Sequence, residues 1–306
     1  MLLFLGKRFL QLLPVLWGVA TLVFFLLHFI PGDPVDIMLG EAALPVNKMN
    51  LRNKLHLNES IPKQYLLYLQ SITAGDLGES LLSQKKVSSL IAERYSNTLQ
   101  LAFLAVLLAI FIAIPLGVIS AIYKKTFIDY SISLITLGGI SIPGFWLGTL
   151  LILFFSVKLG WLPVSEKESW QSYLLPTITL GISLAAILTR ITRNNLLEIL
   201  NQDYIVTARS KGLKENIIYF KHALKNALIP VITIVALQLG ALLAGTVVTE
   251  TIFDWPGIGE LLYRGIQSRD YPLVQGCVLV IAITYVLANT IADIAYTLAN
   301  PKLNLE

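Results

Sequence analysis

Long apolar runs alternate with shorter polar segments along the whole chain. A helix that crosses a hydrocarbon core of about 30 Å needs roughly 20 residues, because it rises about 1.5 Å per residue. Each of six runs is long enough and predicts a membrane-spanning helix: Phe9–Ile30, Thr98–Tyr123, Tyr130–Val157, Leu174–Arg193, Leu228–Glu250 and Leu273–Ala299. The pattern therefore predicts an all-α membrane protein with six transmembrane helices.

Residues 31–97 form the sizeable polar segment between the first two predicted spans. Two amphipathic helices are expected in it, since apolar residues recur at helical spacing at Ile61, Tyr65, Tyr68, Leu69 and Ile72, and again at Val87, Leu90, Ile91 and Tyr95. A segment of this size is too small for a strong core of its own, so we expect it to pack on the spans. The predicted parts are thus an N-terminal segment with the first span (1–30), a small helical insertion (31–97) and a core of five spans (98–306).

The stretch Asp203–Pro230 is polar and basic although it lies between two predicted spans. Asp203 is a good N-cap residue, and Gly212 suits the left-handed conformation that ends a helix, so Tyr204–Lys211 is predicted as a short helix. A helix of about two turns is marginal alone, so we expect something outside the membrane to hold it. A second helix is expected from Lys214, with a kink at Pro230 and one apolar face made of Ile217, Phe220, Leu224 and Leu228.

Composition and charge support a membrane protein with both termini in the cytoplasm. Hydrophobic residues make up 55% of the 306 residues and charged residues only 14%. With the N-terminus inside, 12 of the 23 Lys and Arg residues fall on the cytoplasmic side, 4 in short outer loops and 7 in segment 31–97. Cytoplasmic loops of membrane proteins carry such an excess of Lys and Arg. Because the basic residues follow the membrane topology, the net charge of +4 does not indicate nucleic-acid binding.

Metal and covalent chemistry find little support in the sequence. The single cysteine, Cys277, lies in an apolar run, and the three histidines, His28, His56 and His222, have no ligand spacing. The Gly257–Gly259 turn is not followed by Lys-Ser or Lys-Thr, so it does not predict a phosphate-binding loop. We expect no enzyme activity, cofactor or metal in this chain.

Polar residues in or near the spans are candidates for function. Asn289 and Asp293 lie one turn apart in the last predicted span, and an acid inside a membrane span is a functional candidate by default. The favoured alternative is structural, with Asp293 paired to Arg190 or Arg193. Glu250, Arg269 and Asp270 lie at outer ends of predicted elements and could line an outer entrance, or hold the outer loop through a salt bridge.

The stretch Asp203–Pro230 resembles the cytoplasmic EAA loop of binding-protein-dependent ABC importer permeases, with Gly212 and Pro230 at the spacing of that loop. Many families have Glu-Ala-Ala in this loop, whereas this chain has Thr207-Ala208-Arg209. The Thr-Ala-Arg form is typical of the oligopeptide, dipeptide and nickel permeases, which the chain therefore resembles. Further motifs of that family recur along nearly the whole chain: Pro31-Gly32-Asp33-Pro34, Gly75-Asp76-Leu77-Gly78, Glu250-Thr251-Ile252-Phe253, Pro256-Gly257-Ile258-Gly259 and Arg269-Asp270-Tyr271-Pro272.

This resemblance implies a type I importer permease in the cell membrane that forms half of a pore. It implies a second homologous permease, two ATPase subunits that carry ATP and Mg, and an extracytoplasmic binding protein. Segment 31–97 would be periplasmic, and loop 194–227 would be the coupling loop, with Ala208 facing the ATPase. The residues implied in coupling are Asp203, Tyr204, Thr207, Ala208, Arg209 and Gly212. Small peptides are the first choice of cargo, nickel or another metal chelate is the alternative, and a secondary transporter fits less well.

Overall fold

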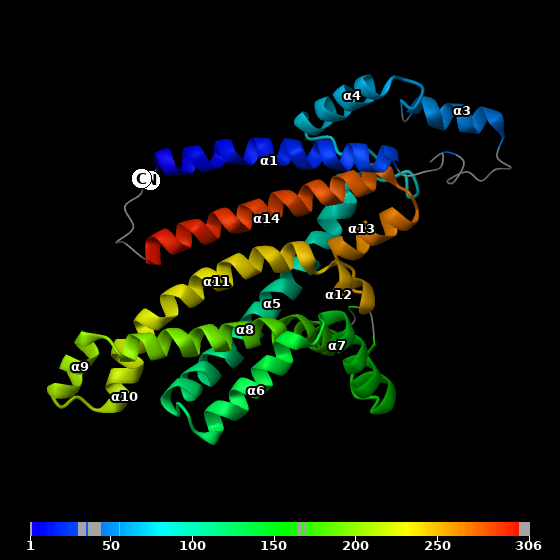
Figure 1. Cartoon of the computed structure of the whole chain (residues 1–306). Coiled ribbons are helices and arrows are strands. Elements are labelled where there is room, and N and C mark those ends of the chain that lie inside the picture. The colour runs from blue at the N-terminus through cyan, green and yellow to red at the C-terminus, as the bar shows by residue number, and fades with distance from the viewer. Residues whose placement is uncertain are drawn as a thin grey trace. The chain divides into compact units, whose positions relative to one another are not determined.

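The computed structural model describes residues 2–29, 35, 44–54, 56–164, 167 and 169–299. These residues are almost entirely helical, and the β pairing among them is an isolated bridge between Glu79 and Lys86. The first helices are α1 (Leu2–Phe29), α3 (Pro45–Lys54), α4 (Ile61–Thr73), α5 (Val87–Ile122), α6 (Phe127–Ser141), α7 (Gly144–Leu151) and α8 (Leu174–Leu200). The others are α9 (Asp203–Ser210), α10 (Glu215–Ile217), α11 (Leu224–Gly245), α12 (Val247–Ile252), α13 (Ile258–Gln267) and α14 (Tyr271–Ala299), as labelled in Figure 1. The all-α fold class is confirmed.

Four continuous helical stretches of the described chain are long and apolar enough to cross a membrane: Val87–Ile122, Trp170–Leu200, Glu215–Leu243 and Tyr271–Ala292. A fifth candidate span is the pair Phe127–Ser141 and Gly144–Lys158. Within the first predicted span, α1 contains a shorter apolar stretch, Leu13–Leu26. The six predicted runs are therefore helical where they are described, except at Ile142–Pro143 in the third run and at Thr246 in the fifth.

The second predicted span begins earlier than the sequence analysis placed it. The amphipathic helix around Val87–Tyr95 and the span from Thr98 are one continuous helix, α5. The physical reason is that no proline or glycine separates Tyr95 from Thr98, so nothing in this stretch ends the helix.

The third predicted span is broken rather than continuous. Helices α6 and α7 meet at an angle of 99°. Ile142 is extended, with φ −80° and ψ 120°, because the ring of Pro143 excludes the helical conformation from the residue before it. Pro143 also has no N–H to continue the helix, and α7 therefore starts anew at Gly144.

The chain forms two compact units, one of residues 1–98 with 256–284 and the other of residues 99–255 with 285–306. The core of the first unit is a cluster in which the amphipathic start of α5 meets α13 and α14, built on Val87, Ile91, Ile258, Leu273 and Cys277. In the same unit, the buried carboxylate of Glu260 binds both Arg94 and Arg264. This ion-pair cluster fixes α13 on α5, and no spacing in the sequence predicts it.

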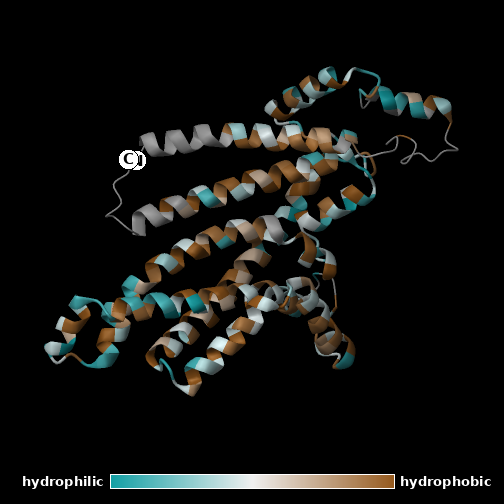
Figure 2. Cartoon of the chain, in the orientation of Figure 1, coloured by the Kyte–Doolittle hydropathy of each residue, from teal (hydrophilic) through white to brown (hydrophobic). Residues whose placement is uncertain are grey.

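The second unit is organised around α8, which packs against α5, α6 and α11. Gly117 lets α5 approach α8 closely, because a Cβ there would lie 2.6 Å from the Cβ of Thr192. Buried residues of this unit form one cluster on Val106, Ala109, Leu184, Leu188 and Val231. Figure 2 shows mostly apolar residues along α5 and α11 and hydrophilic residues gathered at α9 and α10.

Candidate functional site

Helix α9 starts one residue earlier than predicted. Its N-cap is Gln202, which is extended at φ −78° and ψ 148°, and Asp203 is the first residue of the helix. The prediction of Asp203 as the N-cap is therefore wrong. A carboxylate in the first turn is nevertheless favourable, since it faces the positive end of the helix dipole.

The inner face of α9 packs on the chain's own core. Ile205 is fully buried, and Ala208, one turn further on, packs against the same cluster, which includes Val118, Leu196 and Ile218. This placement contradicts the expectation that Ala208 faces outwards. The reason is the helical period, which puts positions 205 and 208 on one face of α9.

The outer face of α9 exposes a different set of side chains. Tyr204 is 41% exposed and Val206 is 52% exposed, although both carry large apolar groups. Tyr204 is held in place because its hydroxyl accepts a hydrogen bond of 2.8 Å from Nδ2 of Asn226. Thr207 is also exposed, and its hydroxyl donates back to the carbonyl of Asp203 over 2.9 Å. The predicted coupling residues that are exposed are Asp203, Tyr204, Thr207, Arg209 and Gly212, while Ala208 is half-buried.

Gly212 ends α9 in the left-handed conformation, as predicted, with φ +75°. The turn is closed by a hydrogen bond of 2.9 Å from the N–H of Gly212 to the carbonyl of Arg209. Across it, Nε of Arg209 lies 2.9 Å from Oε1 of Glu215. This hydrogen bond with Glu215 raises the pKa of the Arg209 guanidinium above its ordinary value. The Arg209–Glu215 pair therefore links the short helix α9 to the segment that follows it.

The second helix of the stretch begins after Lys214, close to its predicted start. Leu224 and Leu228 of its predicted apolar face pack on the core, but the first part of that face differs. Residues Ile218–Ala223 form a π-helical turn, and the chain continues as α11 through Pro230. Ile217 and Phe220, predicted on the apolar inner face, are exposed, whereas Ile218 and Ala223 are fully buried. A π turn holds more residues per turn than an α-helix, so it rotates the inner face away from the positions predicted for a regular helix.

Arg193 has a partner that the sequence analysis did not predict. Its Nε lies 2.7 Å from Oδ1 of the buried Asp129, and its Nη2 lies 2.8 Å from Oδ2. Ser120 and the backbone N–H of Lys125 also donate to this carboxylate, over 2.6 and 2.9 Å. Arg193 therefore joins α8 to the first turn of α6. Of Asp293, the partner considered for it, the structure describes the backbone in α14 and not the side chain.

Two of the three candidates at the outer ends of elements, Glu250 and Asp270, are buried. Asp270 is 1% exposed and accepts hydrogen bonds from Oγ of Ser80 at 2.6 Å and from the N–H of Leu82. These contacts tie loop 80–82 to the start of α14, which gives Asp270 a structural role. Arg269, just before it, has a positive φ of 52°. Glu250, in the second unit, is fully buried on α12.

Asn289 lies where α14 meets α11 within the second unit. A Cβ at Gly240 would come within 3.2 Å of its Oδ1, so the small residue makes room for the amide. Among the described residues, no group of three or more His, Cys, Asp or Glu side chains could hold a metal ion.

Comparisons with known proteins agree with this architecture. Residues 113–305 match the family model described as binding-protein-dependent transport system inner membrane component, and residues 1–102 match the model for its N-terminal part. The chain is 38% identical to a dipeptide transport system permease protein of Alkalihalophilus pseudofirmus, over 99% of both chains. It is 40% identical to a glutathione transport system permease protein of Escherichia coli, again over 99% of both chains.

A solved structure has the same fold at low sequence identity. It is an inward-facing structure of the MetNI methionine ABC transporter, which matches with a TM-score of 0.58 and 20% identity over 69% of this chain and 96% of that chain. The family models between them match residues 1–102 and 113–305, and the relatives match over nearly the full length. The chain belongs to the family of binding-protein-dependent transport system inner membrane components.

Proposed function

We propose that this chain is the transmembrane permease subunit of an ATP-binding-cassette importer that takes up short peptides. The observation that carries the proposal is the match over nearly the whole chain to permease proteins named for dipeptide and glutathione transport. Both named cargoes are small peptides. No described cluster of metal ligands favours the alternative of a nickel or chelate importer.

In this proposal α9 docks on an ATPase subunit through its exposed face. Exposed apolar groups such as Tyr204 and Val206 lose contact with water when a partner covers them, which favours association. The buried face, with Ile205 and Ala208, stays on the permease core. Two opposite faces of one short helix would thus serve docking and attachment, which is the arrangement needed to pass motion between subunits.

The proposed assembly contains a second homologous permease, two ATPase subunits and an extracytoplasmic binding protein. ATP and Mg would be bound by the ATPase subunits, and the permease itself would hold no cofactor and catalyse no reaction. The excess of Lys and Arg in the loops on one side supports a multi-pass protein of the cytoplasmic membrane with both termini in the cytoplasm. The same orientation puts residues 31–97 outside, where they would meet the binding protein.

Transport would follow from a shift between two conformations of the assembly. ATP binding favours the closed ATPase dimer, and α9 couples that closure to the orientation of the spans. ATP can move the equilibrium only by its difference in affinity for the two states. The permease would contribute the path, while the binding protein would set most of the selectivity.

Reconstitution tests the proposal directly. The chain alone, its complex with partner permease and ATPases, and the complex with binding protein are placed in liposomes, and uptake of a labelled peptide is measured with and without ATP. We expect uptake only with the full set and ATP. Uptake of peptide by the isolated chain without ATP would contradict the proposal.

A further inference from the structure

A cavity of about 340 Å³ lies within the second unit, between α6 and α8. From α8 its lining includes Arg190, Arg193 and Asn194, and from α6 it includes Ser133, Leu137 and Ile140. Both charged residues of the lining are arginines, and no carboxylate of the described chain belongs to it. The cavity therefore joins a positively charged polar part to an apolar part.

Arg190 supplies a positive charge to this cavity. It is exposed, and it forms no hydrogen bond or ion pair within the described residues. Arg193, three residues later, is different because it binds the buried carboxylate of Asp129. An arginine stays protonated in proteins and carries five N–H donors. Among the described residues, nothing competes with an anionic ligand for the donors of Arg190.

Two exposed neighbours offer further donors at the same cavity. Asn194, one turn after Arg190, accepts a hydrogen bond of 3.3 Å at its Oδ1 from Nη1 of Arg193. That contact uses the carbonyl end of the amide and leaves the amino group for a ligand. Ser133 belongs to α6, and its hydroxyl has no hydrogen-bond partner in the described part of the chain. Donors from two helices thus line one cavity, which suits a group with several charged oxygens such as a phosphate.

The cavity extends from the level of the membrane surface toward the bilayer centre. Arg190 lies three residues before the end of the fourth predicted span, and Ile140 lies ten residues after the start of the third span at Tyr130. Ten helical residues cover about 15 Å, which is half of a hydrocarbon core of about 30 Å. Both of these span ends face the cytoplasm in the proposed orientation. The charged part therefore lies at the inner membrane surface, and the apolar part reaches the middle of the bilayer.

The surface beside the cavity has the composition of a membrane interface. Tyr123, just after α5, and Tyr130, at the start of α6, are 50% and 64% exposed, and tyrosine is enriched at membrane surfaces. Lys125, in the turn between them, is exposed. Its N–H donates to Asp129 over 2.9 Å, which places this turn next to Arg193. Basic residues at this level attract anionic lipids.

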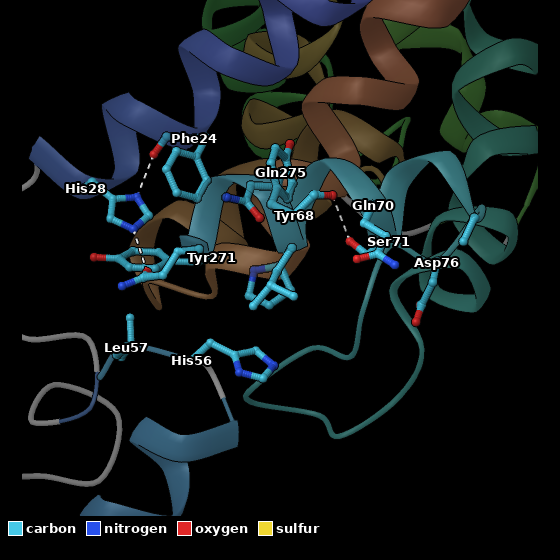
Figure 3. Close-up of a pocket in the computed structure, with 14 residues that line it drawn as sticks. Phe24, His28, His56, Leu57, Tyr68, Gln70, Ser71, Asp76, Tyr271 and Gln275 are labelled. Atoms are coloured by element: carbon cyan, nitrogen blue, oxygen red, sulfur yellow. Dashed lines mark hydrogen bonds between the residues drawn. The ribbon is translucent and has the colours of Figure 1, made fainter. Parts of the chain in front are cut away.

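A cavity in the first unit, shown in Figure 3, lacks such a charge. It has a volume of about 470 Å³, and its lining includes His28 and Asp76 but no arginine or lysine of the described chain. The ring nitrogens of His28 already lie 2.7 Å from the carbonyl oxygen of Phe24 and 3.0 Å from Oε1 of Gln64. A phosphate therefore finds free cationic donors in the cavity beside Arg190 and not in this one.

We propose that the cavity between α6 and α8 binds an anionic phospholipid of the inner leaflet. Its phosphate lies at Arg190, Asn194 and Ser133, and an acyl chain follows Leu137 and Ile140. Basic pockets between membrane helices on the cytoplasmic side are suited to anionic headgroups. A free phosphate would use only the charged part of the cavity, whereas a phospholipid uses both parts. The inference is independent of the cargo and rests on the proposed orientation only for the choice of leaflet.

Photolabelling tests this site in the purified complex of permeases and ATPases. The probes are phosphatidylglycerol and phosphatidylcholine that carry the same diazirine-labelled acyl chain, so they differ only in the headgroup and its net charge. After illumination and trypsin digestion, label is measured in the peptide of residues 126–158, which contains α6. We expect phosphatidylglycerol to reach half-maximal labelling at about tenfold lower concentration, since no ammonium in its headgroup offsets its charge beside Arg190.

Variants assign the headgroup and the chain. Arg190→Gln should raise the half-labelling concentration of phosphatidylglycerol about tenfold and leave that of phosphatidylcholine nearly unchanged. Ser133→Ala should raise it several-fold, because one donor is lost. Leu137→Trp should weaken both lipids alike, since it fills the apolar part that their chains share. Lys225→Gln is the matched control, because it removes an exposed charge on the same predicted side of the membrane but outside the cavity, and it should change nothing.

Several outcomes would overturn the site. They are equal labelling by the two lipids, equal losses for both with Arg190→Gln, or the same loss of phosphatidylglycerol with Lys225→Gln. Displacement of the labelled lipid by millimolar glycerol 3-phosphate would assign the cavity to a free phosphate ester, and displacement by tetra-alanine would assign it to the cargo. Either result would overturn the lipid assignment. The labelling needs no ATP and no uptake, so failure of ATP-dependent uptake would count against the proposed function and not against this site.

Discussion

Gly212 is the position where a single substitution best separates coupling from folding. Its φ is +75°, and a Cβ added there would have no atom within 4 Å. The penalty of Gly212→Val therefore comes from the backbone alone, not from a clash. An L-residue in this left-handed region costs about 1–2 kcal/mol, and a β-branched one is the least tolerated.

That strain can be compared with the contacts that hold the turn. The Arg209–Glu215 pair has side chains that are 40% and 49% exposed, and such a pair is worth at most about 1 kcal/mol. Burial of a side chain such as Ile205, which is fully buried, contributes about 1.5–3 kcal/mol. The strain thus exceeds the ion pair but not the burial. We expect α9 to stay on its cluster while the turn between Ser210 and Lys214 changes conformation.

The expected result is normal membrane abundance with about tenfold lower ATP-dependent uptake, because about 1.4 kcal/mol corresponds to a factor of ten. Abundance is measured by immunoblot, and docking by co-purification of the ATPase. Gly212→Asn is the matched control, since asparagine tolerates the left-handed conformation and should retain most of the uptake. Parental uptake by Gly212→Val, or equal losses in both variants, would refute the argument.

Three further predictions concern docking, packing and topology. Val206→Glu should weaken co-purification of the ATPase at normal abundance, whereas Ala208→Glu should lower abundance itself because it puts a charge against the core; the opposite pattern would contradict the assignment of faces. Arg193→Ala should lower the free energy of unfolding of the purified complex by about 3–5 kcal/mol, because it leaves the buried Asp129 unpaired. The double variant with Asp129→Asn should recover part of this loss. In a Cys277→Ala background, a cysteine at Ser169 should react with an impermeant thiol reagent in cells without an outer barrier, and one at Ser210 only after permeabilisation; equal labelling would contradict the topology.

The spans could be predicted from the sequence because their length and apolar composition are a direct consequence of the bilayer thickness. The end of α9 could be predicted for a similar reason, since Gly212 is the residue type that its backbone requires. Helix boundaries that no glycine or proline marks were predicted less well. In one case two predicted helices are a single helix, and in the other the N-cap lies one residue earlier than predicted. The fusion of Val87–Tyr95 with the second span and the cap at Gln202 are the two examples.

The pairing of polar groups could not be predicted because it depends on which helices become neighbours. Arg193 binds Asp129, 64 residues earlier, and Asp270 binds Ser80, 190 residues earlier. No spacing in the sequence connects these positions. The prediction that Ile217 and Phe220 lie on the inner face was wrong for a related reason, since the π turn at Ile218–Ala223 has no residue signature that the helical period reveals.

The packing of α9 explains how a small contact surface could act on several spans in the proposed coupling role. Ile205 and Ala208 lie in one cluster with Val118 of α5, Leu196 of α8 and Ala227 of α11. Ile205, Leu196 and Ala227 are fully buried, and a close-packed interior has little free volume to absorb a displacement. A shift of α9 imposed by an ATPase would therefore be passed to three helices together. The exposed face with Tyr204 and Val206 would receive the motion, and the buried face would distribute it.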